Sequence, residues 1–406
     1  MTRTRTSTAL ASLAVGGFAI GTTEFVTMGL LPQIAEGVGV SIPQAGRVIS
    51  TYALGVVVGA PLLAVLTARV SRTRLLLVLM AAFSLGNIAS ALAPTYETLL
   101  VARFAAGLPH GAYFGIASLV AASMVDPSRR GRAVMMPLLG LTAANVIGVP
   151  ASSFVGQELG WRAAYWFVAV VGLVTVLLVW RRVPQVEATA GAAPRSELRA
   201  LASKQVWLTA AIGAIGFGGM FAVYSYIAPI LTEAAHWSQR SVPLALALFG
   251  VGMTIGTLLG GRVGDWSVPG ALLIGFTATL LTLLVFPLAA ASGWGIAIVV
   301  PLLGVVSSIT VSGLQLRLMD MAGPGAASLG ASLNHSSLNL ANAAGAFAGG
   351  LVIEAGHGWT SPALVGAAMA AVGLVLSVVS VLAQRRARAR PDADRVRAAE
   401  PAQVPA

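Results

Sequence analysis

The chain has 406 residues, of which 57% are hydrophobic and 10% are charged, whereas a soluble globular domain carries about 25% charged residues. This composition excludes an ordinary soluble enzyme, and the lack of cysteine excludes disulfides and cysteine-based metal or redox sites. The net charge of +11 does not indicate nucleic-acid binding, because the basic residues lie between apolar segments and form no basic domain.

Apolar segments long enough to cross a bilayer recur from residue 8 onward. About 20 apolar residues span the hydrocarbon core as a helix. The first segment exceeds the 7–15-residue apolar region of a signal peptide, so we predict that it is retained. The predicted fold class is an all-α polytopic membrane protein with about twelve transmembrane helices. The predicted spans are 8–31, 47–67, 74–93, 97–121, 131–155, 162–182, 205–231, 241–262, 269–291, 293–316, 327–352 and 360–383.

The longest internal loop, residues 183–204, separates the sixth span from the seventh. When the chain crosses the membrane at each predicted span, most of the 25 Lys and Arg residues fall on one side. By the positive-inside rule, that side is the cytoplasm. Both termini and this loop are predicted to be cytoplasmic. The predicted parts are an N-terminal six-helix bundle at 1–182, a linker at 183–204, a C-terminal six-helix bundle at 205–383 and a disordered tail at 384–406.

The two predicted halves share residues at nearly constant spacing. Gly59 corresponds to Gly252 at an offset of 193, and Asn145 corresponds to Asn342 at an offset of 197. Ordered matches of this kind indicate an internal repeat. Parallel six-helix repeats are the architecture of one large transporter class.

Glu24 is the one acid inside a predicted span, and Thr22, Thr23 and Thr27 make its surroundings polar. A charged side chain at the bilayer centre costs roughly 2.5–3.5 kcal/mol, so such a residue is a functional candidate. Glu24 lies about 10 Å from the outer end of the span, too deep for a glutamate to reach water. We therefore predict that Glu24 couples transport to protons, in preference to the alternative of an acid that reaches the membrane surface.

Arg103 is the one base inside a predicted span, at a depth similar to that of Glu24. Buried charges in membranes usually pair, so Arg103 is the second predicted proton-coupling residue. Two arrangements remain open. Arg103 could pair with Glu24 directly or through water, or it could bind backbone carbonyls and never touch Glu24.

Further polar side chains share helix faces inside the spans. His110 lies on the same face as Arg103, where it could titrate, bind substrate or only pack. In the eleventh span, polar residues form a stripe that faces either neighbouring helices or a water-filled cavity. Tyr224 of the seventh span is a further candidate, with the alternative that it anchors its helix at the membrane surface, where tyrosine is common. The predicted substrate-binding residues are His110, Asn145, Tyr224, His335, Asn339 and Asn342.

Catalytic and metal-binding constellations are not predicted. His236 and His357 lie in outer loops, and His110 and His335 lie in separate halves, so the histidines form no metal site. There is no ATP-binding motif, so active transport would have to use an ion gradient. We expect no enzyme activity, no cofactor and no metal.

Four segments carry a family resemblance: GTTEFVTMGLLPQIA at 21–35, RFAAGLPHGAYFG at 103–115, GLTAANVIGVPASSFVGQELGWR at 140–162 and NLANAAGAFAGG at 339–350. Together they resemble the major facilitator superfamily, and within it the bacterial drug:proton antiporters of the arabinose-exporter-like and chloramphenicol-resistance branch. The resemblance implies a monomeric, proton-coupled antiporter of the bacterial inner membrane. Its partners would be a small, largely apolar substrate such as a chloramphenicol-like drug, protons and the lipid bilayer, without nucleic acid.

The resemblance also implies gating residues. The loop between spans two and three has Ala68 where the family usually has an aspartate, so the charge latch of that loop is incomplete or rearranged. The matching segment of the second half, GGRVGD at 260–265, keeps its acid. The predicted gating residues are Gly59, Arg69, Arg72, Gly140, Gly148, Pro150, Arg262 and Asp265.

Two other functions remain open. One is export of sugars or another small metabolite, which the polar stripe of the eleventh span would suit. The other is a non-transporting membrane sensor or assembly subunit, although the short loops leave no sizeable soluble domain for signalling. Within a transporter, coupling is expected in the N-terminal half, because the residue that corresponds to Glu24 in the second half is Phe221, which cannot titrate.

Overall fold

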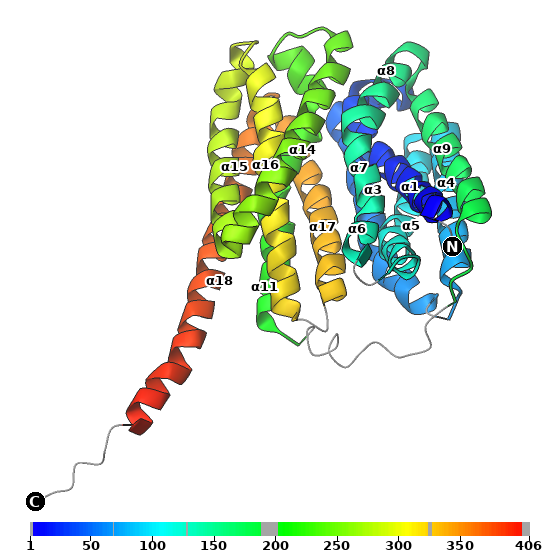
Figure 1. Ribbon diagram of the computed structural model, residues 1–406. Helices are drawn as coiled ribbons and strands as arrows, with labels where there is room; N and C mark the ends of the chain where they lie inside the picture. Colours follow the sequence, from blue (N-terminus) through cyan, green and yellow to red (C-terminus); the bar gives the residue numbers. More distant parts are fainter. Residues whose placement is uncertain (1–2, 68, 127–128, 188–201, 324–326, 400–406) are drawn as a thin grey trace, which may run out of the picture.

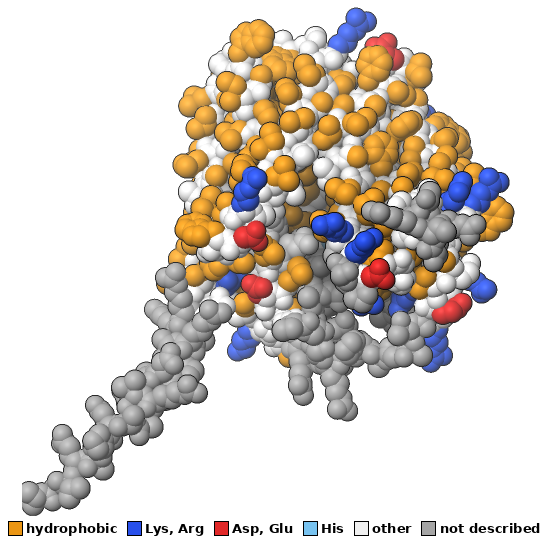
Figure 2. Space-filling view, in the orientation of Figure 1, with side chains coloured by type: hydrophobic (Ala, Val, Ile, Leu, Met, Phe, Trp, Pro, Cys, Tyr) orange, Lys and Arg blue, Asp and Glu red, His pale blue; other side chains and the backbone are white. Residues whose placement is uncertain are grey.

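The computed structural model describes residues 3–67, 69–126, 129–187, 202–323 and 327–399, which contain helices and no strand. Two groups of helices, α1 to α9 and α11 to α18, lie side by side (Figure 1). Hydrophobic side chains cover most of the face seen in Figure 2, as expected of a surface in contact with lipid. The predicted all-α architecture with two six-helix bundles is confirmed.

The N-terminal half contains α1 (Arg3–Gly29), α2 (Leu31–Val38), α3 (Ile42–Leu66), α4 (Arg72–Leu92), α5 (Tyr96–Ser123), α6 (Arg130–Val134), α7 (Met136–Ala143), the π-helix η2 (Ala144–Gly148), α8 (Val149–Leu159) and α9 (Trp161–Arg182). The C-terminal half contains α11 (Lys204–Gly216), α12 (Gly218–Tyr224), α13 (Ile227–Pro229), the π-helix η3 (Ile230–Ala234), the 3-10 helix η4 (Gln239–Ser241), α14 (Val242–Trp266), α15 (Val268–Ala291), α16 (Ile296–Ala322), α17 (Ala327–Glu354) and α18 (Ser361–Ala399).

The predicted spans correspond to these helices. Within the described residues, 11 stretches are long and apolar enough to cross a membrane. They match every predicted span except the second, which the structure forms as the 25-residue helix α3. The fifth and seventh predicted spans are interrupted helices: the fifth comprises α6 to α8, and the seventh comprises α11 to η3.

We name the two ends of the molecule by the chain segments they carry. The linker end carries Arg182, where α9 ends, and Lys204, where α11 begins. The far end carries Ser41, which caps α3, and Glu354, the last residue of α17. The Ser41 hydroxyl accepts a hydrogen bond from the backbone N–H of Gln44 at 3.3 Å, and the Gln44 side-chain oxygen accepts one from the Ser41 N–H at 3.1 Å. This capping box fixes where α3 begins.

The internal repeat is a repeated contact between helices. A Cβ atom on Gly59 of α3 would strike the backbone carbonyl of Leu108 in α5, and one on Gly252 of α14 would strike that of Pro301 in α16. Leu108 and Pro301 are separated by the same number of residues as Gly59 and Gly252. The glycine match predicted from the sequence therefore marks the same close approach of two helices in each half.

Replacing Gly252 by Val should lower thermal stability in detergent by about 1–3 kcal/mol, because the side chain would push α14 from α16. Gly261→Val is the matched control: Gly261 lies on the same helix, and a Cβ there meets nothing within 4 Å. Thermal unfolding of the two variants measures the difference. Equal melting temperatures would show that this contact does not limit stability.

Two segments outside the spans differ from simple loops. The beginning of the linker is held at the start of α4, where the Arg72 N–H donates to the Val186 carbonyl at 2.7 Å.

α18 continues to Ala399, through most of the tail expected to be disordered at 384–406, since alanine and arginine favour helix. Arg317 of α16 is buried and donates to Ser380 at 2.7 Å and to Gln384 at 3.2 Å, which joins α16 to α18.

Candidate functional site

A buried acid lies on α1. The Glu24 side chain is 8% exposed, and it is the one buried acid among the described residues. Arg103 of α5 and Asn342 of α17 lie near its carboxyl group, so it has neighbours from both halves. No described cation lies within 4 Å of it as an ion-pair partner. A charge buried without a close partner is costly, which makes the charge state of Glu24 sensitive to small movements around it.

Arg103 is fully buried beside this acid. One guanidinium nitrogen donates to the Thr23 hydroxyl at 3.0 Å, and the other terminal nitrogen donates to the Thr23 backbone carbonyl at 3.1 Å. The Thr23 hydroxyl in turn donates to the Asn87 side-chain oxygen of α4 at 2.6 Å. Arg103 therefore binds the residue next to Glu24 on α1, and the structure shows no direct ion pair between Arg103 and Glu24 within 4 Å.

Two tyrosines complete the surroundings of Arg103. Its guanidinium lies 4.2 Å from the ring centre of Tyr52 and 5.1 Å from that of Tyr165. The Tyr165 hydroxyl lies 2.9 Å from the Thr27 hydroxyl of α1. The Tyr52 hydroxyl lies 3.1 Å from Nδ1 of His110. The faces of two aromatic rings and the neutral acceptors of Thr23 therefore stabilise the arginine, which forms no ion pair with a described acid.

His110, which was predicted to bind substrate or to titrate, is buried in a chain of rings. Its ring centre lies 5.8 Å from that of Tyr52 and 5.5 Å from that of Phe114. Phe114 stacks on His335 of α17, with ring centres 5.7 Å apart and planes at 5°. The structure thus brings together two predicted residues, His110 and His335, through a phenylalanine between them.

The asparagines of α17 keep unpaired polar atoms. The Asn339 side-chain N–H donates to the His335 carbonyl at 3.0 Å, but its oxygen has no hydrogen-bond partner among the described residues. Asn342 is fully buried, and neither polar atom of its side chain has a hydrogen-bond partner within 3.5 Å in this part of the chain. Buried polar groups are normally hydrogen-bonded. These atoms are therefore available to a ligand, to water or to Glu24.

Asn145 and Tyr224 lie on opposite sides of the boundary between the halves. Asn145 belongs to η2, donates to the Leu141 carbonyl at 3.0 Å and has an unpartnered side-chain oxygen. π-Helical turns are frequent at functional sites. Tyr224 is buried, with its ring stacked on Phe249 at 3.9 Å and edge-on to Phe25 at 5.9 Å, so it is not a membrane-surface anchor.

The predicted gating residues fall into two groups. Gly140 of α7 and Gly148 of η2 face α1, where a Cβ would strike the Ala14 carbonyl and the Thr22 hydroxyl, and Pro150 is in the first turn of α8. These residues let the fifth span approach the helix that carries Glu24. Gly59 has the equivalent role between α3 and α5.

The charged gating residues lie at the linker end. Arg69, Arg262 and Asp265 are exposed, Arg72 is half-buried, and none of them makes an ion pair with a described residue. Ala68 lies outside the described residues. The structure therefore brings no predicted charge latch together in the part of the chain it describes.

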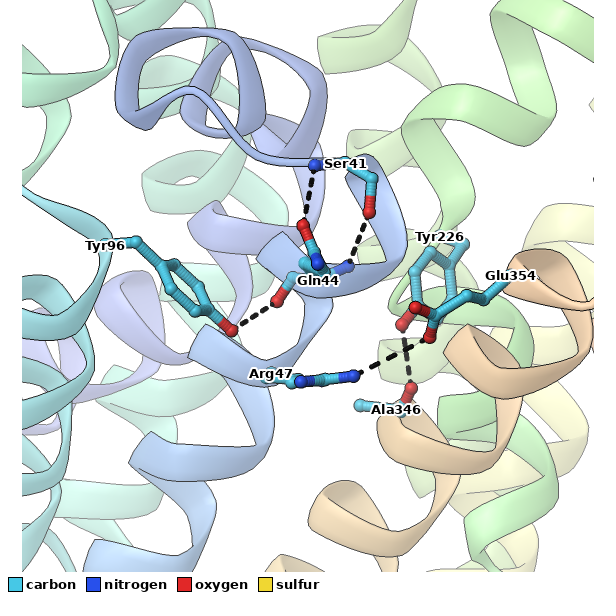
Figure 3. Close-up of polar contacts among 7 residues, drawn as sticks. All are labelled: Ser41, Gln44, Arg47, Tyr96, Tyr226, Ala346 and Glu354. Atoms are coloured by element: carbon cyan, nitrogen blue, oxygen red, sulfur yellow. Dashed lines mark hydrogen bonds and ion pairs between the residues drawn. The ribbon is translucent and has the colours of Figure 1, made fainter.

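An ion pair joins the two halves at the far end (Figure 3). Arg47 of α3 is 3.6 Å from Glu354 of α17, and the Ser50 hydroxyl donates to the Ala343 carbonyl at 3.0 Å. Arg47 is the first residue of the second predicted span, and the structure places it inside α3, which begins five residues earlier at Ile42. The ion pair is half-exposed and contributes at most about 1 kcal/mol.

Comparison with known proteins adds the family. A family model described as Major Facilitator Superfamily matches residues 13–336 and 210–404. The inner membrane transport protein YdhP of Escherichia coli strain K12 is 42% identical over 375 residues, which cover 92% of this chain and 96% of that protein. A chloramphenicol resistance protein of Streptomyces lividans is 37% identical over 257 residues, covering 62% of this chain and 66% of that protein. The crystal structure of a bacterial homologue of the human lysosomal transporter Spinster has the same fold, with a TM-score of 0.69, 16% identity and coverage of 94% and 96%.

Proposed function

The chain belongs to the major facilitator superfamily of membrane transporters, and we propose that it is a proton-coupled antiporter that exports small, largely apolar compounds by alternating access. The observation that carries the proposal is Glu24, a buried acid with no described cation within 4 Å and with Asn342 of the other half beside it. The name of the chloramphenicol resistance protein supports export of apolar drugs.

Glu24 supplies what such a cycle needs. A ligand shifts a conformational equilibrium only when it binds the two states differently. A proton on Glu24 meets this condition, because rocking of one half against the other changes the distance from its carboxyl group to Asn342. The carboxylate takes up a proton from the outside and releases it to the cytoplasm, and the substrate moves outward when Glu24 is deprotonated.

Arg103 has a supporting role in this proposal. Its two hydrogen bonds to Thr23 fix the turn of α1 that carries Glu24. The C-terminal half then contributes mainly the wall of the substrate cavity.

Uptake and efflux in cells test this function. We expect cells that overproduce the protein to accumulate less chloramphenicol than control cells, and an uncoupler that removes the proton gradient to abolish the difference. Efflux that persists with the uncoupler would contradict proton coupling. The second candidate is export of a hydroxylated sugar, favoured by the side-chain oxygen of Asn339 and the amide of Asn342, which have no hydrogen-bond partner among the described residues. Reduced accumulation of a non-metabolised glucoside, with chloramphenicol unaffected, would support this candidate.

The proposed orientation has the linker end in the cytoplasm, because the arginine-rich loops lie there. The chain has no cysteine, so single introduced cysteines report their side unambiguously. In intact cells, a membrane-impermeant thiol reagent should label His357→Cys at the far end, whereas Glu187→Cys should be labelled only after permeabilisation. Both sites are exposed. The opposite pattern would invert the topology and the direction of transport with it.

A further inference from the structure

Phe114 of α5 and His335 of α17 form a stacked pair of rings across the boundary between the halves. We propose that a flat aromatic compound binds between these two rings, so that the antiporter prefers planar aromatic substrates to saturated compounds of the same size. This inference deepens the proposed export function and rests on it.

The geometry suits insertion of a flat ring. The two rings are nearly parallel, at 5°, and their centres are 5.7 Å apart. Insertion of a third ring requires them to separate by about one ring thickness, ~3.5 Å, the contact distance of carbon atoms. Because the rings belong to different halves, rigid movement of the halves achieves this separation without refolding either helix.

The two rings differ in how firmly they are held. Phe114 is buried, with Tyr113 edge-on at 5.9 Å and His110 on another side at 5.5 Å. A Cβ atom on Gly17 of α1 would contact the Phe114 ring at 3.4 Å. His335 is half-buried and lies on α17, so Phe114 forms a fixed wall and His335 the wall that moves with the other half.

An aromatic ligand gains more from this site than a saturated one. Opening the pair removes one ring contact, and a flat aromatic ligand replaces it with two. A saturated ligand buries a similar apolar area but makes no ring contact. These two ring contacts favour the aromatic ligand by about 5- to 140-fold in the dissociation constant.

The site also communicates with the proton site. His335 lies seven residues before Asn342, on the same face of α17, and Asn342 is near Glu24. On the other wall, His110 contacts Phe114 and binds the hydroxyl of Tyr52, whose ring lies under Arg103. A ligand that separates Phe114 from His335 therefore changes the surroundings of Glu24, which is the differential binding that exchange requires.

Equilibrium binding to the purified full-length chain tests the inference. The probes are 2-naphthol and decahydro-2-naphthol, which share a carbon skeleton but differ in that only the first is flat and aromatic. Fluorescence anisotropy of 2-naphthol gives its dissociation constant, competition gives that of the saturated compound, and protein-free micelles correct for partitioning. We expect the wild type to prefer 2-naphthol by about 5- to 140-fold.

The variants assign this preference to the two rings. Phe114→Leu and His335→Leu should each remove one of the two ring contacts and lower the ratio of dissociation constants by about 2- to 12-fold. His335→Phe, which keeps a flat ring, should retain the preference. Two leucine variants are used because Phe114 is a core residue and its replacement could unfold the protein. Glu24→Gln should also keep the preference, which separates a failure of proton coupling from a failure of this inference. A ratio near one in the wild type, no saturable binding of 2-naphthol, or an unchanged ratio in both leucine variants would overturn the inference.

Discussion

Replacing Glu24 by Gln should reduce proton-driven efflux about 100-fold, since groups that transfer protons typically contribute 10²–10⁴-fold to a rate. Glutamine keeps the size of the side chain and cannot ionise, so it can neither take up nor release a proton. The variant should insert and fold normally, because no described residue forms a close ion pair with Glu24 that the substitution would break. Efflux from proteoliposomes under an imposed pH gradient measures the effect.

Glu158→Gln is the matched control for this experiment. Glu158 is an exposed acid near the end of α8, so the same chemical change there should leave the efflux rate unchanged. Passive exchange of substrate without a gradient should persist in Glu24→Gln, because the substitution removes the proton and not the cavity. Proton-driven efflux at the wild-type rate in Glu24→Gln would transfer the coupling role to another group, with His110 as the next candidate.

Arg103→Ala should have its largest effect on stability, with a loss of about 3–5 kcal/mol. The substitution removes two hydrogen bonds from a charged group, each worth roughly 1.5–3 kcal/mol. It also leaves an empty volume between Tyr52 and Tyr165 and removes the cation nearest to Glu24. Thermal unfolding in detergent measures the loss, and Arg240→Ala, at an exposed arginine of the far end, is the control.

Arg103→Lys separates charge from geometry. Lysine keeps the positive charge but lacks the planar fork that binds the hydroxyl and the carbonyl of Thr23 at once. We expect a stability between those of the wild type and Arg103→Ala. An alanine variant as stable as the wild type would mean that Arg103 does not organise the site.

The sequence was sufficient for the fold because hydropathy and loop charge act over whole spans. Twenty apolar residues have one stable form in a bilayer, and a repeated glycine contact such as that of Gly59 and Gly252 leaves a visible spacing. The interruptions of the seventh span were not predictable in this way, because α11, α12 and α13 remain apolar throughout.

The site was predictable only in part. Glu24 and Arg103 were found because charge inside a span is rare, but their relative orientation depends on how α1 and α5 are rotated. Spacing within one helix cannot give that rotation, so Thr23 as the partner of Arg103 followed only from the structure. Tyr52 was missed for the same reason: it lies on α3, and its role depends on contacts with Arg103 and His110 of α5.

Proton release upon substrate binding tests the central claim most directly. Chloramphenicol is added to purified protein in weakly buffered detergent solution at a series of starting pH values, and a pH indicator records released protons. If substrate and proton exclude each other through Glu24, the wild type releases protons as the drug binds, and Glu24→Gln binds the drug without releasing any. Equal proton release from the wild type and Glu24→Gln, or drug binding to the wild type without release at any starting pH, would contradict coupling through Glu24.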